Sequence, residues 1–587
     1  MRKIAAMIFT CVSITTYSQA LAYKLELTEP HKHYYYVTMT VEGWKKNTLD
    51  VKMPVWAPGS YLVREFAKGV DYVKANSGGS TLTVAKTDKS TWQIKTDGKS
   101  KIEIRYNVYA FETSVRTSYL DASHGFVSGS SVFMYIPEMK VNSGTLEIVP
   151  GSFKRISTTL KNVNVNTFAY ANMDELYDCP IEIGNHEEFD FMAGGCRHRV
   201  AMYGEGNYEV EKLKKDMAVV CEEATKVWGE NPNKEYLFII HNLTVGSGGL
   251  EHASSTTLDV SRNTYSPASY TGFLSIVAHE YFHLWNVKRL RPAGLFPYDY
   301  DKENYTDLLW VAEGFTSYYD ELLLKRAGYY DEGGYIRSLN STLASVENTP
   351  GSKVQSAAES SFDAWIKGYR PNENTNNRTI SYYPKGSLIA AMLDIEIIAS
   401  TNGKMKLDDL LRKLYNDFYK VKKTGYTFAD FKAAAENICG KKMDDFFNTL
   451  VLTASDVNYN QYLNKVGYML IATARGNEPW LGIQTKDGAG GKVMISAVSD
   501  GSCAQNSGLM VNDEIIAVSN TRVDNNTLYR FVGSFPVGTT LEFLIARDNL
   551  IQTVNVKLDK SYMKDFVITA AETVTKDVKA LRDKWLN

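Results

Sequence analysis

Cysteine is scarce in this sequence, and its spacing offers no metal-binding or disulfide framework. Only 6 of the 587 residues are cysteine, and no two have the CxxC spacing of a metal site. Five of them follow the N-terminal segment, an odd and sparse set that argues against a disulfide scaffold, with Cys179 and Cys196 as one candidate pair. We therefore expect the chemistry of the protein to reside in other side chains.

Long apolar runs and an excess of charge are also lacking. Beyond the first residues, no stretch approaches the roughly 20 apolar residues that cross a bilayer, so no transmembrane segment is predicted. The formal net charge is -2 and 22% of the residues are charged, which excludes a polybasic surface and argues against nucleic acid as a partner. With 44% apolar residues, the chain is typical of a globular protein, and it is too long for a single core.

The N-terminal residues have the pattern of a secretory signal peptide. Arg2 and Lys3 precede the apolar run Ile4–Val12, and Ala20-Leu21-Ala22 offers small residues for cleavage before Tyr23. We therefore expect a mature protein that is secreted or periplasmic.

The rest of the chain changes its hydrophobic period from region to region. Short runs such as Tyr34–Val41 and Lys101–Tyr109 alternate apolar and polar residues, which predicts antiparallel strands. From Val210 the apolar residues recur every three or four positions, which predicts helices. The predicted fold is multidomain α+β. We expect a signal peptide at 1–22, an N-terminal antiparallel β domain at 23–200, an α-rich domain at 201–460, a β-rich module at 475–560 and a C-terminal helix or tail at 561–587.

The strongest chemical signal is the HExxH motif formed by residues 279–283. It lies within the helical pattern Leu274–Val287. Because residues four apart share a helix face, His279 and His283 can bind one Zn²⁺, while Glu280 lies beside them as a general base.

A catalytic zinc site needs a third protein ligand. A metzincin would have glycine and histidine where this chain has Asn286 and Arg289, so that class is excluded. The remaining candidate is Glu313, on a predicted helix that begins after Thr306 as the N-cap and ends near Ala327. The sequence thus predicts one Zn²⁺ per chain, held by His279, His283 and Glu313.

These residues resemble the glycyl aminopeptidase family of the gluzincin metallopeptidases. The resemblance covers His279–Arg289, Tyr305–Thr316 and the N-terminal segment Pro54–Tyr61 with Arg64-Glu65-Phe66. It implies a thermolysin-like catalytic domain and removal of one N-terminal residue, Gly or Ala, from a peptide.

The resemblance also implies roles for two further segments. Gly248-Gly249-Leu250-Glu251 is similar to the strand that binds the substrate's free α-amino group through a glutamate in the wider clan, which usually has asparagine where this chain has His252. The register of Tyr382-Tyr383-Pro384-Lys385-Gly386 makes Tyr383 the counterpart of the tyrosine that stabilises the oxyanion.

Near the C-terminus, Trp480-Leu481-Gly482-Ile483 opens a segment that resembles a PDZ domain. Such a loop has backbone N–H groups that bind a peptide's terminal carboxylate, so Leu481, Gly482 and Ile483 are the expected carboxylate loop.

The predicted function is zinc-dependent aminopeptidase activity on peptides. Two alternatives stay open: a zinc endopeptidase, and a secreted PDZ-type peptide-binding protein with a vestigial metal site. The intact set His279, Glu280, His283 and Glu313 argues against the second alternative.

Overall fold

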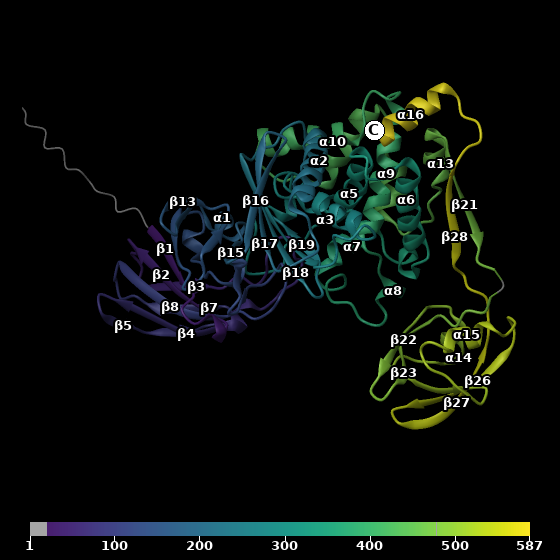
Figure 1. Ribbon diagram of the computed structural model, residues 1–587, viewed down its shortest axis with the longest axis horizontal. Coiled ribbons are helices and arrows are strands. Elements are labelled where there is room, and N and C mark those ends of the chain that lie inside the picture. The colour runs from purple at the N-terminus through teal and green to yellow at the C-terminus, as the bar shows by residue number, and fades with distance from the viewer. Residues whose placement is uncertain (1–19, 477) are drawn as a thin grey trace, which may run out of the picture. The chain divides into compact units, whose positions relative to one another are not determined.

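The computed structural model describes residues 20–476 and 478–587, and its contacts divide the chain into two units (Figure 1). The first unit contains the residues up to Ala57 together with Arg64–Asn185. The second contains Pro58–Val63 and His186–Asn587. Most of the predicted signal peptide lies outside the described residues, and the first strand, β1, begins at Ala20.

The first unit is built from β-sheets, as the alternating pattern predicts. In β2 (Tyr34–Glu42) and β8 (Lys101–Tyr109), every second side chain is buried, and the two strands pair antiparallel with Val37 opposite Tyr106. Among the described residues, the main sheet has the order β13-β14-β11-β1-β2-β8-β4-β5. Its other strands are β1 (Ala20–Glu26), β4 (Val70–Ser77), β5 (Ser80–Leu82), β11 (Gly144–Val149), β13 (Lys161–Asn164) and β14 (Thr167–Tyr170).

Two smaller sheets and a short helix complete the described part of the first unit. One sheet has the order β12-β15-β10-β9 and the other β3-β7-β6. Their elements are β3 (Thr48–Lys52), β6 (Val84–Lys86), β7 (Thr91–Lys95), β9 (Tyr119–Leu120), β10 (His124–Val127), β12 (Arg155–Ser157), α1 (Met173–Tyr177) and β15 (Ile181–Gly184).

The second unit opens with a sheet of the order β16-β17-β18-β20-β19, formed by β16 (Glu187–Ala193), β17 (Cys196–Tyr203), β18 (Glu235–Leu243), β19 (Ser247–Glu251) and β20 (Ser255–Ser261). Strands β16 and β17 therefore belong to the second unit, whereas the sequence places the domain boundary near residue 200. The period-2 pattern continues through both strands, and periodicity does not reveal which sheet a strand joins.

Helices dominate the next part of the second unit. Helix α2 buries the predicted face, including Leu213, Met217 and Val220. Helix α3 contacts α5, and α5 contacts α9. No described helix is both long and apolar enough to span a membrane. The helices are α2 (Val210–Trp228), α3 (Tyr270–Phe282), α4 (Leu309–Ala312), α5 (Gly314–Arg326), α6 (Glu332–Glu347), α7 (Ala357–Phe362), α8 (Thr375–Arg378), α9 (Tyr382–Ser400), α10 (Leu407–Leu414), α11 (Phe428–Cys439), α12 (Asp444–Phe447), α13 (Asn460–Leu463) and α16 (Lys576–Leu586).

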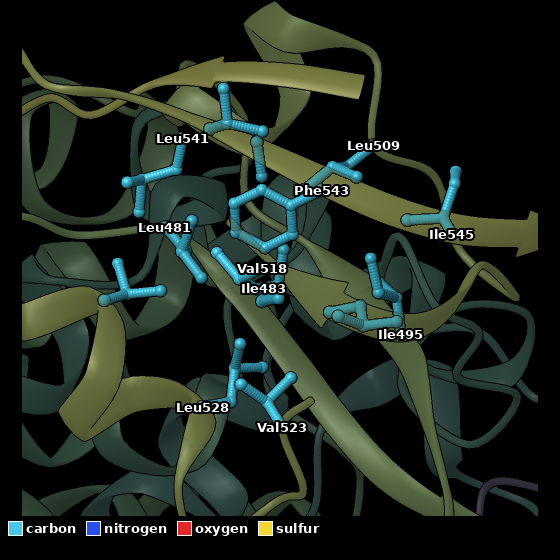
Figure 2. Close-up of a cluster of buried hydrophobic side chains, with 14 of the residues drawn as sticks. Leu481, Ile483, Ile495, Leu509, Val518, Val523, Leu528, Leu541, Phe543 and Ile545 are labelled. Atoms are coloured by element: carbon cyan, nitrogen blue, oxygen red, sulfur yellow. The ribbon is translucent and has the colours of Figure 1, made fainter. Parts of the chain in front are cut away.

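A C-terminal module is inserted between β21 (Tyr468–Ala474) and β28 (Lys564–Ala570), which pair antiparallel. It has its own core, in which Phe543 lies among the labelled aliphatic side chains in Figure 2, such as Leu481 and Val518. Its elements are β22 (Ile483–Gly488), β23 (Lys492–Val498), α14 (Cys503–Ser507), β24 (Glu514–Val518), β25 (Thr521–Arg522), α15 (Leu528–Gly533), β26 (Thr540–Arg547) and β27 (Leu550–Lys557).

The described cysteines are buried, and no disulfide joins any two of them. The candidate disulfide between Cys179 and Cys196 is therefore absent from the described part of the chain.

Candidate active site

Helix α3 presents the two histidines of the HExxH motif. His279 lies in its last turn, and His283 follows as the C-cap residue with helical backbone angles. The two rings are 4.8 Å apart between centroids. His279 and His283 therefore lie on one face, as the spacing predicts.

Glu313 meets both imidazoles. Its Oε2 lies 3.2 Å from Nε2 of His283 and 3.7 Å from Nε2 of His279. Ligand atoms in a tetrahedral zinc site with bonds of about 2.0–2.1 Å are roughly 3.3 Å apart, so these distances suit a shared metal ion. The three side chains form one of the groups of the described residues that could hold a metal.

The backbone around Glu313 differs from the prediction. We expected a continuous helix with Thr306 as the N-cap, but α4 follows Leu308, and Glu313 stands at the break between α4 and α5. Thr306 Oγ1 instead accepts a hydrogen bond from the backbone N–H of Leu308. The interruption is one residue long, because the N–H of Glu313 still donates to Leu309 and its backbone oxygen accepts from Ser317, so the helical direction continues through the site.

Two residues orient the histidines through their far ring nitrogens. Nδ1 of His279 lies 2.9 Å from Oδ2 of Asp320, and Nδ1 of His283 lies 2.9 Å from the backbone oxygen of Asn286. The Asn286 amide in turn donates to the backbone oxygens of Val311 and Ala312, next to Glu313. Such partners fix the orientation of each ring and leave Nε2 for the metal.

Sequence reasoning missed both of these partners. Asp320 follows Glu313 by seven residues, about two helical turns, and this spacing is the signal that could have identified it. Asn286 contacts His283 through its backbone oxygen, which every residue has, so the residue type gave no signal of this contact.

The donor set fits zinc. Two imidazoles and one carboxylate are a recognised catalytic zinc set, and the Nδ1 contacts leave both Nε2 atoms facing Glu313. Burial lowers the pKa of His279, but the contacts with Asp320 and Glu313 outweigh burial and raise this pKa. The surroundings of the imidazoles are thus negative and favour a cation.

Glu280 lies in the same cluster and has an unusual environment. Its side chain is buried, and its Oε2 has no hydrogen-bond partner among the described residues. Burial raises the pKa of this carboxyl, against the opposing effect of the two histidines. An unpaired buried carboxylate oxygen costs free energy, so its position indicates a functional role in contact with water or substrate.

Gly249 makes room for Glu280. A Cβ at this position would lie 2.2 Å from Oε1 of Glu280, and the preceding Gly248 has a φ of +140°. Only glycine therefore fits at 249 without displacing the carboxylate. Both glycines lie on β19, the last strand in the sheet order given above.

Glu251, at the end of β19, is buried and belongs with Glu280 and His283 to a second group with ligand atoms within 4.8 Å of one another. The structure thus brings the predicted amine-binding carboxylate to the predicted base and one metal ligand. Two carboxylates at this distance suit a cationic partner such as an α-ammonium group.

Tyr383 also reaches the site. The centroid of its ring lies 6.2 Å from that of His279, with 27° between the ring planes. Tyr382 stacks on Tyr383 with a centroid distance of 4.9 Å. Gly314 and Gly386 allow this approach, because a Cβ on Gly314 would lie 2.4 Å from the Cα of Gly386. Of the two tyrosines, the one selected by the sequence register is the one that faces the histidine.

The expected carboxylate loop of the C-terminal module precedes an edge strand. Leu481 and Ile483 are buried in the module core, and Gly482 has a φ of +69°. Strand β22 begins at Ile483 and ends the sheet order β22-β23-β24-β26-β27. Backbone groups at a sheet edge are available for pairing with a peptide strand.

Comparisons with known proteins match two parts of the chain to one family. Residues 272–389 match the M61 glycyl aminopeptidase family, and residues 22–185 match the peptidase M61 N-terminal domain. No curated protein matches the sequence.

Solved structures resemble the chain over a greater length. The aminopeptidase N family protein from Idiomarina loihiensis has 28% sequence identity and a TM-score of 0.90, covering 97% of this chain and 100% of its own. The M1 zinc metallopeptidase from Deinococcus radiodurans has 13% identity and a TM-score of 0.49, covering 75% of this chain and 94% of its own. The first of these likenesses supports the predicted order of an N-terminal β-rich domain and a helical middle domain.

Proposed function

We propose that this chain, two parts of which match M61 peptidase family models, is a zinc-dependent aminopeptidase. The observation that carries the proposal is one buried cluster in which His279, His283 and Glu313 lie beside Glu280 and Glu251. A metal-ligand set, a base and an anchor for an ammonium group are the parts that removal of an N-terminal residue requires.

His279, His283 and Glu313 would hold one zinc ion. When bound, zinc supplies Lewis-acid chemistry that polarises the scissile carbonyl and acidifies water. Glu280 accepts the proton of the attacking water and then passes it to the nitrogen of the leaving peptide. The Tyr383 hydroxyl donates a hydrogen bond to the carbonyl oxygen as negative charge develops there.

Glu251 limits the reaction to the first peptide bond. Its carboxylate pairs with the α-ammonium group of the substrate, and the edge strand β19, with Gly248 and Gly249, aligns the peptide backbone. The aminopeptidase N family name of the Idiomarina loihiensis structure supports an exopeptidase. We propose Gly or Ala as the preferred first residue, on the resemblance to glycyl aminopeptidases.

Two further proposals concern the ends of the chain. The pattern of residues 1–22 supports export, to the periplasm or the exterior. The C-terminal module is proposed to be PDZ-like and to bind a peptide C-terminus at Leu481, Gly482 and Ile483, which is supported by the position of β22 at a sheet edge.

The proposed function is tested with purified protein by zinc analysis and by hydrolysis of alanine and glycine aryl-amides. We expect one zinc per chain, loss of activity with a chelator and recovery with zinc. The Glu313→Ala variant should lose zinc affinity, because two histidines under-coordinate the ion. Equal cleavage of acetylated and free peptides would favour an endopeptidase, and zinc-loaded protein without any hydrolysis would refute the peptidase function.

A further inference from the structure

The segment Pro58–Val63 belongs to the second unit although its neighbours in sequence form the first. Gly59 has a φ of +92°, and a Cβ built on it would lie 2.5 and 2.6 Å from the two carboxylate oxygens of Glu251. The backbone at Gly59 therefore touches the carboxylate proposed to bind the α-ammonium group. This part of the Pro54–Tyr61 motif has no role in the mechanism described above.

Tyr61 follows two residues later and is only 1% exposed. Its ring contacts Trp365 and Tyr369 edge-on, with centroid distances of 5.8 and 5.9 Å. Burial and the neighbouring charges of Glu313 and Glu251 raise the pKa of the Tyr61 hydroxyl, which remains a neutral phenol close to both carboxylates. Tyr61 thus packs against aromatic side chains and lies close enough to Glu313 and Glu251 to be affected by their charges.

These aromatic side chains continue towards the metal ligands. Tyr369, Tyr382 and Tyr383 all line a cavity of about 350 Å³. Tyr382 stacks on Tyr383, whose ring faces His279. The first side chain of a bound peptide must lie beside the carboxylate that holds its ammonium group, because both are attached to the same Cα atom.

We propose that Tyr61 is a specificity-determining residue, whose ring restricts the subsite for the substrate's first side chain, and that Gly59 provides the space for the Glu251 carboxylate. This inference rests on the proposed aminopeptidase function and gives its preference for small residues a structural cause. The substrate class is peptides with a free amino terminus and a first side chain no larger than a methyl group.

The test compares kcat/KM for leucine and alanine aryl-amides with the zinc-loaded full-length protein. The ratio of the two values does not depend on the fraction of active enzyme, so partial misfolding does not affect it. Tyr61→Ala should raise the leucine-to-alanine ratio at least about tenfold, because a change in pocket size alters discrimination between such side chains by roughly 10–200-fold. Tyr61→Leu offers a less disruptive second variant, with a smaller increase expected.

Two controls separate the effect of a changed pocket shape from the effect of a general loss of folded structure. Tyr61→Phe keeps the ring and should keep the parental ratio. Tyr426, which is fully buried against Phe418 and Phe431, should tolerate replacement by alanine without a change in the ratio.

Gly59→Ala tests the contact with Glu251 separately. It should raise KM for the alanine substrate at least about tenfold, since its Cβ displaces a carboxylate that binds a charge. Gly538 is the matched control, because it has a similar φ of +90° and no atom within 4 Å of an added Cβ, so Gly538→Ala should leave KM unchanged.

An unchanged leucine-to-alanine ratio in active Tyr61→Ala and Tyr61→Leu would overturn the role of Tyr61. An unchanged KM in Gly59→Ala would overturn the role of Gly59. If the zinc-loaded parent hydrolysed neither substrate, the proposed function itself would fail, and this inference with it.

Discussion

The metal-site region and the C-terminal module each contain a buried carboxylate, and the two carboxylates differ in their hydrogen-bond partners. In the module, Asp513 is fully buried and binds Arg547 through both of its oxygens at 2.8 Å. In the metal-site region, Glu280 is buried with one oxygen that no described group satisfies. The paired carboxylate stabilises the module, whereas the unpaired one lies among the metal-ligand candidates, where it can contact water or substrate.

The two regions also share a feature, because β19 and β22 both lie at a sheet edge. Strand β19 ends at Glu251, among the charged groups of the candidate active site, while β22 starts from a loop whose flanking residues are buried apolar side chains. The same backbone geometry is therefore proposed to serve a reaction in one region and recognition in the other. The comparison predicts large effects on turnover from changes near β19 and none from changes in the module.

The largest effect is expected for Glu280→Gln. The amide cannot accept the proton of water, so kcat should fall by about 10²–10⁴-fold. Zinc content should stay at the parental level, and the melting temperature should not fall, because no hydrogen bond of the unpaired oxygen is lost.

The control for this variant is Glu321→Gln. Glu321 also has one carboxylate oxygen without a partner among the described residues, but its other oxygen accepts a hydrogen bond from Ser275 on α3. It is not one of the grouped ligand candidates, so its change should leave kcat close to the parental value. More than about a tenth of parental activity in Glu280→Gln would show that Glu280 is not the base.

Glu251→Ala should have the next largest effect. Removing one partner of a buried, hydrogen-bonded charge pair costs about 2–5 kcal/mol, so kcat/KM for free-amine aryl-amides should fall roughly 30-fold or more. Acetylated peptides, which lack the ammonium group, should be poor substrates for the parent. Parental kinetics in a zinc-loaded Glu251→Ala variant would place the amine site elsewhere.

Asp320→Asn should lower the zinc affinity more than it lowers the rate of hydrolysis at saturating zinc. The Asp320 carboxylate holds the Nδ1 side of His279, and replacing such a partner typically lowers metal affinity by about 10–100-fold. Competition with a zinc chelator measures this affinity. With saturating zinc, much of the activity should return, and an unchanged affinity would remove Asp320 from the site.

The smallest effect on turnover is expected for Asp513→Ala in the module. Leaving Arg547 without its partner should destabilise the module by about 1–2 kcal/mol, because the arginine side chain is still 35% exposed and partly hydrated. Turnover of small aryl-amides should be unchanged. Replacement of the exposed Glu542 by alanine is the control, and no change in thermal unfolding is expected for it. A loss of turnover in Asp513→Ala would contradict the prediction and show that the two regions are coupled.

Much of the candidate site was predictable because short sequence motifs mark its residues. The spacing of His279 and His283 specifies one helix face, and the structure places both on it. Glu313 and Tyr383 were selected by short motifs, and both lie beside the histidines. The alternation in β2 and β8 likewise predicted which side chains are buried.

The sequence by itself thus determined the two histidine candidates, the candidate base and the types of the main elements, because each depends on a repeat of two to four residues along the chain. Glu313 was selected by a short motif of its own. Only the tertiary structure decided which sheet β16 and β17 join, that the helix breaks at Glu313, and that Asp320 orients His279. It also brought Gly59 against Glu251, nearly two hundred positions away in the chain. Such contacts arise from packing between distant segments, and no local period of the sequence encodes them.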